Sequence, residues 1–532
     1  MPARPRRPIR VGLNGPMADG AMALLHDGLA RWAATMPDEE AVAFGDHRLS
    51  WAQWHERIRR LTGALVARGI GAGDRVAVID RNHLASLDMI LAAGALGAIT
   101  VLPNWRLKDA ELTYVLGDCS PRLVVLGAAF VDREELIRMA APSIEHVVHL
   151  DDDYESWLSS GTPTSPAADV RPDTPVLVIY TSGTTGAAKG VVFSHSALIA
   201  NAEVSALTAH AEPGDRALTS MPLFHIGGVG AALAAVESGL PQTILADPTP
   251  DAIVQAIEQG CTRTFLVPAV IDRMLAAGQR ERQALASLSL LAYGGSPCPR
   301  PILEAALAAM PDTDIVQVYG MTELCGSVTQ LSNTAHRDSD HRERLAAAGQ
   351  LVDHVDVRIV DPTTLLDVSP GDAGELWFRT PKRMQGYLGQ PEATAQVIVD
   401  GDWLRTGDIG RMDEEGFIFI VDRLKDIIIT GGENVFSPEV ESVVAEHPSV
   451  AEVSVIGIPD STMGERVTAV VTAAQGKTVD PDDVITFTRT RLAGFKCPRT
   501  VVVVDELPRN ASGKVLKHEL RTSIAASNVG AS

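Results

Sequence analysis

The sequence is poor in cysteine, in positive charge and in long apolar runs. Its 532 residues include 5 cysteines, which are widely scattered and form neither a CxxC pair nor a histidine-rich metal spacing. An odd number of dispersed cysteines is typical of a reduced, cytoplasmic chain without a structural zinc site. The 46 lysines and arginines are outnumbered by 67 aspartates and glutamates, so the formal net charge is −21. Such a charge repels phosphate backbones, and nucleic acid is therefore not an expected partner.

No apolar run is long enough to cross a membrane, so integral membrane association is not expected. The longest, Met89–Leu102, has about 14 residues, whereas a transmembrane helix needs roughly 20. We expect it to form a buried helix that runs into a strand. The arginine- and proline-rich start, Met1–Arg10, lacks the apolar core of a signal peptide and is expected to be a frayed tail. The sequence has no period of 20 to 50 residues, which excludes a solenoid.

The pattern between Ala21 and about Val421 predicts an α/β fold, because helical stretches alternate with short runs of β-branched residues. We expect a disordered basic tail over residues 1–20, a large layered α/β N-terminal domain over 21–422 and a smaller mobile α+β C-terminal domain over 423–532. Expected strands and helices of the large domain are Arg75–Asp80, Arg122–Leu126, Val176–Tyr180 and Thr264–Val267, and Ser50–Arg68 and Thr249–Glu258.

The C-terminal part has its own local signals. Ser437 is predicted to cap a helix whose first residue is Pro438, and Asp480 to cap a second helix. Ala451–Ile458 and Thr500–Val504 have the composition of strands.

The most informative segment is Tyr180–Gly190, which reads YTSGTTGAAKG and precedes a helix that Ser194 or Ser196 could cap. Hydroxyl groups, backbone N–H groups beside glycines and a lysine cation favour phosphate binding. The segment is not a Walker A loop, because Lys189 is followed by glycine rather than by serine or threonine. A flexible turn is the alternative on composition alone. The candidate phosphate-binding residues are Thr181, Ser182, Gly183, Thr184, Thr185, Gly186 and Lys189.

Later segments contain further candidates. Glu323 in YGMTE could hold Mg²⁺, and Asp408 in WLRTGD could accept hydrogen bonds from both ribose hydroxyls; alone, each could equally be a solvated turn residue. Lys514 lies in the loop sequence PRNASGK, where a single lysine is usually solvated. His225 in PLFHIGG could border a pocket or be a satisfied core histidine.

Together these segments resemble, in order, the signatures of the adenylate-forming superfamily, which includes acyl-CoA synthetases, peptide-synthetase adenylation domains and luciferases. This chain has Ala188 where the family usually has proline. Asn104–Leu107 and Asp422–Glu441 look most like bacterial fatty-acyl and related acyl-CoA synthetases. The segments that carry the resemblance are 180–190, 319–323, 374–376, 386–387, 403–408, 422–434 and 508–514.

The resemblance assigns roles to individual residues. It implies that Lys514, Glu323, Thr184 and His225 are catalytic, and that Lys425 is a hinge between the domains. It places Gly431 and Gly432 along the channel for coenzyme A. The acyl pocket would be lined by His225, Tyr293, Gly294, Gly295 and Val318. Tyr319 would pack along the adenine, Thr322 would contact the α-phosphate and Glu323 would hold the metal. Asp408 and Arg423 would contact the ribose, and Gly320 would be a further nucleotide-binding residue.

The implied function is that of an ATP-dependent acyl-CoA synthetase of fatty acid metabolism. A carboxylic acid would react with ATP and Mg²⁺ to give acyl-AMP and pyrophosphate, and coenzyme A would then take the acyl group and release AMP. An acyl-AMP ligase that loads a carrier-protein thiol and a catalytically silent nucleotide-binding homologue are the alternatives. Medium-chain, long-chain, aryl and steroid-derived acids are all compatible substrates, and a homodimer is left open.

Overall fold

The computed structural model describes residues 24–151, 153–181, 188–460, 462–509 and 515–529. In these residues the chain forms two compact units. The large unit contains residues up to 357 together with 378–405, and the small unit contains 358–377 and the residues from 406 onward. The chain therefore passes between the units within three strands, β16 (Asp356–Val360), β17 (Gly374–Arg379) and β20 (Trp403–Met412).

One sheet of the large unit has nine strands in the order β15-β14-β13-β12-β11-β9-β10-β1-β2. Its inner strands pair in parallel, and β2, β14 and β15 pair antiparallel at the two edges. Strands β1, β9 and β12 are largely buried, as expected where helices cover both faces of a sheet. Its strands are β1 (Glu40–Phe44), β2 (His47–Ser50), β9 (Ala217–Thr219), β10 (Gln242–Ile244), β11 (Arg263–Leu266), β12 (Leu290–Gly294), β13 (Asp314–Met321), β14 (Gly326–Leu331) and β15 (Gln350–Leu351).

The second sheet of the large unit has the order β18-β8-β7-β4-β3-β5-β6. Strands β7, β4, β3, β5 and β6 are parallel, whereas β8 and β18 are antiparallel to their neighbours. The sheet therefore ends in a two-strand edge next to the expected phosphate loop. Its strands are β3 (Arg75–Ile79), β4 (Ile99–Leu102), β5 (Leu123–Leu126), β6 (His146–His149), β7 (Pro175–Thr181), β8 (Lys189–Ser194) and β18 (Gly386–Tyr387).

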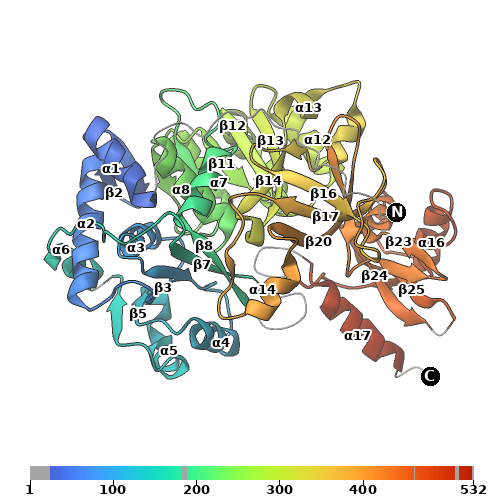
Figure 1. The fold of residues 1–532 in the computed structure, drawn as a ribbon. Helices are drawn as coiled ribbons and strands as arrows, with labels where there is room; N and C mark the ends of the chain where they lie inside the picture. Colours follow the sequence, from blue (N-terminus) through green and yellow to red (C-terminus); the bar gives the residue numbers. More distant parts are fainter. Residues whose placement is uncertain (1–23, 152, 182–187, 461, 510–514, 530–532) are drawn as a thin grey trace, which may run out of the picture. The chain divides into compact units, whose positions relative to one another are not determined.

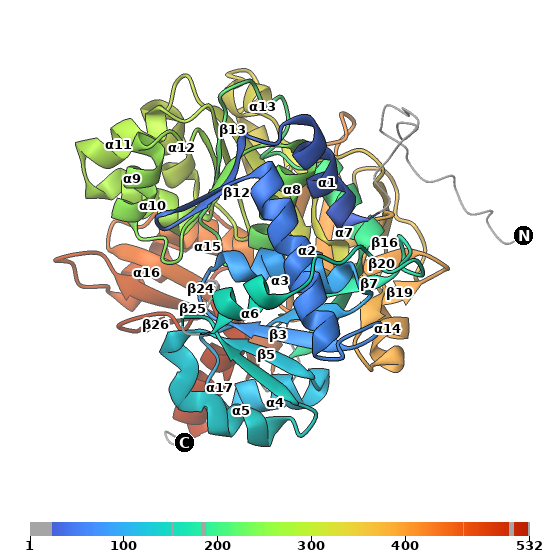
Figure 2. The ribbon, with the colours of Figure 1, turned by 90° about the vertical axis from the view of Figure 1, so that its left-hand side faces the viewer.

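Helices of the large unit cover these sheets, and α1, α2 and α3 lie side by side (Figure 2). Helix α3 is buried along its whole length, which explains its apolar sequence on every side. Helix α2 begins with a capping box in which Ser50 and Gln53 bond to each other's backbone N–H. The helices are α1 (Leu25–Thr35), α2 (Trp51–Ala67), α3 (Leu84–Gly94), α4 (Asp109–Cys119), α5 (Glu134–Ala140), α6 (Tyr154–Ser160), α7 (His195–Glu203), α8 (Ile226–Ser238), α9 (Pro250–Glu258), α10 (Pro268–Ala277), α11 (Gln279–Ala286), α12 (Arg300–Ala309), α13 (Asn333–Arg337) and α14 (Pro391–Val397).

Helix α1 covers an unusual buried carboxyl on α8. The side chain of Glu237 lies so close to Gly28 that a Cβ there would be 2.9 Å from its Oε2. Neither carboxyl oxygen has a hydrogen-bond partner among the described residues. Burial raises the pKa of Glu237 to about 8, with a smaller contribution from the nearby Asp27 carboxylate. The carboxyl is therefore mostly protonated at neutral pH.

Strands β16, β17 and β20 lie in a five-stranded sheet with the order β16-β17-β20-β19, in which β19 is Ile398–Val399 and β21 pairs with β20. The small unit contains a separate sheet with the order β23-β22-β25-β24, in which β26 pairs with β25. Strands β23, β24 and β25 of this sheet are labelled in Figure 1. A buried valine-rich cluster fills the space between this sheet and helices α15 and α16. The elements are β21 (Ile418–Arg423), β22 (Ile428–Thr430), β23 (Glu433–Val435), α15 (Ser437–Ala445), β24 (Val450–Asp460), β25 (Gly464–Ala473), α16 (Pro481–Arg489), β26 (Thr500–Val503) and α17 (Lys517–Val529).

The predicted α/β class, with a large N-terminal and a smaller C-terminal domain, is confirmed. The buried helix and strand expected within Met89–Leu102 are α3 and β4, and Ser194 and Asp480 cap their helices as predicted. Phe436 rather than Ser437 occupies the N-cap position of α15, and it makes no side-chain capping hydrogen bond. In the part of the chain that the structure describes, no helix is both long and apolar enough to cross a bilayer.

Candidate active site

Strands β7 and β8 hold the two ends of the expected phosphate loop. They form an antiparallel pair in which Thr181 lies opposite Lys189. The loop residues Ser182, Gly183, Thr184, Thr185 and Gly186 lie outside the described residues. Strand β8 was not expected between the loop and helix α7, although its sequence KGVVFS is rich in β-branched residues. Lys189 is therefore the first residue of a strand, β8, rather than part of a helix.

Lys189 and Glu323 both contact the side chain of one tyrosine. Strand β18 pairs with β8 so that Tyr387 lies opposite Val191, and this brings the Tyr387 ring to 4.8 Å from Lys189 Nζ. The Tyr387 hydroxyl donates a hydrogen bond of 2.9 Å to Glu323 Oε1. The structure thus places the predicted metal carboxylate near the predicted phosphate cation. Tyr387 was not among the predicted site residues, although its segment GY was recognised as a family signature.

The hairpin of β13 and β14 carries Tyr319, Gly320, Thr322 and Glu323. Its strands approach so closely that a Cβ on Gly320 would lie 1.9 Å from the carbonyl oxygen of Gly326. Only glycine fits at this point. Tyr319 lies 6.4 Å from Phe378 between ring centroids, and Glu323 lies in the short 3-10 turn Thr322–Leu324. The hairpin therefore carries an aromatic residue on strand β13, and a hydroxyl and a carboxylate residue on the 3-10 turn that follows it.

Glu323 is chemically suited to a magnesium ion. It offers a hard carboxylate oxygen donor on a half-buried side chain, and Oε1 accepts the hydrogen bond from the Tyr387 hydroxyl. Mg²⁺ prefers such oxygen donors and is often held by one or two carboxylates together with substrate phosphates. No cluster of three or more His, Cys, Asp or Glu side chains that could bind a metal occurs within the described ranges. Glu323 could therefore share such an ion with the phosphates of a bound nucleotide.

His225 lies at the N-terminus of helix α8, where its carbonyl accepts the first helical hydrogen bonds. Burial, together with the charge of Arg106, lowers its pKa to about 4. Its Nε2 atom is buried and has no hydrogen-bond partner among the described residues. The imidazole is thus neutral at physiological pH and has an unused polar atom. Asn82 fixes the preceding segment by bonding to the backbone of Met221 and Leu223.

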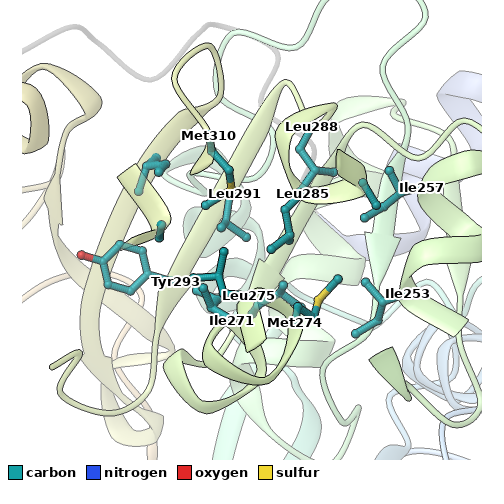
Figure 3. Close-up of a cluster of buried hydrophobic side chains, with 14 of the residues drawn as sticks. Ile253, Ile257, Ile271, Met274, Leu275, Leu285, Leu288, Leu291, Tyr293 and Met310 are labelled. Atoms are coloured by element: carbon teal, nitrogen blue, oxygen red, sulfur yellow. The ribbon is translucent and has the colours of Figure 1, made fainter. Parts of the chain in front are cut away.

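The other predicted acyl-pocket residues lie on β12 and β13. Gly294 pairs with Val318, and a Cβ on Gly294 would lie 2.3 Å from the Val318 carbonyl oxygen. Gly295 has a φ of +79°, which favours glycine. Tyr293 packs into a buried apolar cluster (Figure 3), and its hydroxyl bonds to Gln317 and His336 at 3.0 and 2.8 Å. Tyr293 thus anchors the strand that carries the two glycines.

In the small unit, Asp408 and Arg423 face each other across strands β20 and β21. Arg423 Nε lies 2.6 Å from Asp408 Oδ1, and the Asp408 side chain is almost fully buried. The turn before Asp408 is held by Glu375, whose Oε1 accepts a hydrogen bond of 3.1 Å from Gly407 N. Glu375 was expected only as part of the GEL signature, and in this chain it connects that segment to WLRTGD.

The predicted hinge residue Lys425 lies among charged neighbours. Burial lowers its pKa, and the charges of Arg423 and Arg521 act in the same direction against that of Asp426. Arg521, from helix α17, lies 2.8 Å from Asp426. Gly431 and Gly432 follow at the turn between β22 and β23, both with positive φ. Lys514 lies outside the described residues, between β26 and α17.

The chain matches two family models. The model described as AMP-binding enzyme matches residues 29–388, and the model described as AMP-binding enzyme C-terminal domain matches residues 439–514. The first match alone covers more than half of the chain. The chain therefore belongs to the AMP-binding enzyme family, and the superfamily predicted from its motifs is confirmed.

Individual relatives extend over nearly the whole chain. It is 37% identical to the fatty acid–[acyl-carrier-protein] ligase ScoC of Streptomyces coeruleorubidus over 491 residues, 91% of this chain and 93% of that protein. It is 36% identical to the indoleacetate–CoA ligase of Aromatoleum aromaticum over 511 residues, 94% and 98% of the two chains. Its fold matches o-succinylbenzoate coenzyme A synthetase (MenE) from Bacillus subtilis in complex with ATP and magnesium ion, with a TM-score of 0.81, 27% identity and coverage of 94% and 99%.

Proposed function

We propose that this protein is an ATP-dependent acyl-CoA synthetase, an acid–thiol ligase that forms AMP. Membership of the AMP-binding enzyme family supports the proposal, as do the coenzyme A ligases among its relatives. The structural observation that supports the proposal most directly is that Lys189 and Glu323 both contact Tyr387. A cation and a carboxylate at the foot of a phosphate loop can together bind a nucleotide that carries a metal ion.

In the first step, a carboxylate oxygen of the substrate attacks the α-phosphorus of ATP, and the bond to the bridging oxygen breaks to release pyrophosphate. Lys189 and the loop residues Thr181–Gly186 would bind the phosphates, while Tyr319 and Gly320 border the adenine and Thr322 contacts the α-phosphate. Asp408 and Arg423 would bind the ribose. When bound at Glu323, Mg²⁺ would offset the charge of the triphosphate and of the departing pyrophosphate. Lys514 would stabilise the charge that develops at the α-phosphate.

In the second step, a thiol attacks the acyl carbonyl, loses its proton and displaces AMP. Coenzyme A would approach along Gly431 and Gly432, and rotation about Lys425 would exchange Lys514 for this channel. The neutral imidazole of His225 would border the acyl group, with Gly294, Gly295 and Val318 further along the pocket. No protein nucleophile takes part, so each step is a direct transfer between bound substrates.

The test is pyrophosphate release by the purified protein with ATP, Mg²⁺ and a panel of fatty, aryl and steroid-derived acids, followed by assay of the thioester after coenzyme A is added. We expect release with at least one class of acid and a thioester with free coenzyme A. Complete absence of acid-dependent release would support a silent nucleotide-binding protein instead.

A carrier-protein thiol is the second candidate acceptor, because the relative ScoC is named as an acyl-carrier-protein ligase. Acyl-AMP formation without any thioester to free coenzyme A, but with transfer to a carrier protein that bears phosphopantetheine, would favour this alternative. The cytoplasmic location and the homodimer remain predictions. Cell fractionation and light scattering would test them.

A further inference from the structure

The chain segment that runs from Lys382 to Tyr387 is attached to the β13–β14 hairpin at three points. Lys382 Nζ donates to the carbonyl oxygen of Ser327, Met384 N donates to the carbonyl oxygen of Glu323 at 2.8 Å, and the Tyr387 hydroxyl donates to Glu323 Oε1. Two of the three bonds therefore end on Glu323, one on its backbone and one on its side chain. Both the segment and the hairpin belong to the large unit.

The first attachment point is a lysine buried to 1% exposure. Lysines are almost never buried in this way without a partner, because removing the ammonium group from water is costly. Lys382 Nζ has two oxygen acceptors, since Asn201 Oδ1 also lies 3.4 Å away. Burial nevertheless lowers its pKa to about 8. Such a group fixes the start of the segment to the hairpin, whichever of its protonation states is present.

The last attachment point is Tyr387, whose ring and hydroxyl are both engaged. Backbone pairing of β18 with β8 sets the position of the ring, and Lys189 lies over it as in a cation–π contact. The phenol O–H is the donor of this hydrogen bond, and Glu323 Oε1 is the acceptor.

We propose that Tyr387 is a positioning residue for Glu323, holding Oε1 by its hydroxyl so that Oε2 is directed toward a magnesium ion shared with ATP. This inference rests on the proposed function. Outer groups that orient a metal ligand typically change metal affinity or activity by about 10- to 100-fold when they are removed. A phenol that restrains a single carboxylate ligand is expected to act in this range.

The variant Tyr387→Phe tests the inference, because it keeps the ring and removes only the hydroxyl. The readout is calorimetric binding of α,β-methylene-ATP, which does not react, over a series of Mg²⁺ concentrations and in EDTA. We expect the Mg²⁺ concentration that gives half of the metal-dependent gain in affinity to rise by about 10- to 100-fold, with little change in EDTA. Tyr114→Phe is the matched control, because Tyr114 is an exposed tyrosine on helix α4.

A double-mutant cycle with Glu323→Gln tests separately the positioning role of Tyr387 and the metal-binding role of Glu323. If Tyr387 acts through Glu323, adding Tyr387→Phe to Glu323→Gln changes the Mg²⁺ midpoint less than about twofold. If Glu323→Gln raises the midpoint and Tyr387→Phe does not, the positioning role is refuted while the proposed function stands. If Glu323→Gln leaves the midpoint unchanged, the metal role assigned to Glu323 is itself refuted.

A purely structural role would give a different result. Tyr387→Phe would then weaken binding equally in EDTA and in Mg²⁺, and that outcome also overturns the inference. Should Tyr387→Phe fail to fold, Glu323→Asp carries the same test, because the shorter side chain withdraws the carboxylate from the phenol. Its Mg²⁺ midpoint must rise, and an unchanged midpoint refutes the positioning role.

Discussion

The buried carboxyl of Glu237 makes the stability of the large unit depend on pH. Its pKa of about 8 in the folded chain exceeds the ordinary value of 4.5 because burial disfavours the ionised form. The resulting penalty is absent below pH 4.5, grows between pH 4.5 and 8, and is constant above pH 8. A shift of one pKa unit corresponds to about 1.4 kcal/mol, so ionisation destabilises the folded state by about 3 kcal/mol at pH 7 and about 5 kcal/mol at high pH.

Glu237→Gln removes the ionisation and keeps the size of the side chain. The buried amide has its own cost, but this cost does not change with pH. We therefore expect the free energy of unfolding of the variant, relative to wild type, to rise by about 4 kcal/mol between pH 5 and pH 9. Urea unfolding followed by tryptophan fluorescence is a suitable assay, because every tryptophan except Trp377 lies in the large unit.

Glu135→Gln is the matched control, because Glu135 is exposed on helix α5. Its stability relative to wild type should change by less than about 0.5 kcal/mol over the same pH range. A difference between Glu237→Gln and wild type that stays flat from pH 5 to pH 9 would refute the reasoning. It would mean that water or a polar partner reaches the carboxyl in solution.

Three further predictions concern the site. Gly320→Ala should lower the melting temperature and abolish ATP binding, because its methyl group would collide with the Gly326 carbonyl. Gly71→Ala is the control, because its methyl group enters open space and should leave the melting temperature and ATP binding unchanged. Equal melting temperatures for the two variants would contradict this prediction. Asp408→Asn should raise the KM for ATP about 10-fold with a smaller effect on the KM for the acid, and an unchanged KM for ATP would exclude a ribose contact. Lys514→Ala should depress adenylation far more than thioester formation from supplied acyl-AMP, and equal losses in the two half-reactions would contradict its assigned role.

Local features of the fold were predictable from the sequence. The helix caps at Ser194 and Asp480 are examples, because each serine or aspartate bonds to a backbone N–H within three residues. The cap at Ser437 was predicted wrongly, since this serine is the first residue of α15. Its N–H and hydroxyl instead bond to Asp422, 15 residues earlier. A contact outside the helix thus overrode the local signal.

The motifs indicated which segments are expected to form the site, but not how their side chains contact one another. Tyr387 and Glu323 are 64 residues apart, and only the pairing of β18 with β8 brings them together. Nothing in the sequence distinguishes the buried Lys382 from a surface lysine, because its burial depends on the hairpin that packs over it. Similarly, Glu375 fixes the turn before Asp408 by accepting a hydrogen bond from Gly407 N. This contact depends on β17 and β20 being neighbouring strands of one sheet, which the sequence does not show.

The pairing of β18 with β8 has a consequence for synthesis of the chain. Val191 leaves the ribosome 196 residues before its partner Tyr387. At ordinary rates of translation, this separation corresponds to about 10 to 40 s during which β8, which follows the expected phosphate loop, lacks its neighbour β18. We expect nascent chains arrested before residue 386 to bind no ATP analogue, and chains arrested after the large unit has fully emerged to bind it. Binding by the shorter chains would show that the late strand is dispensable.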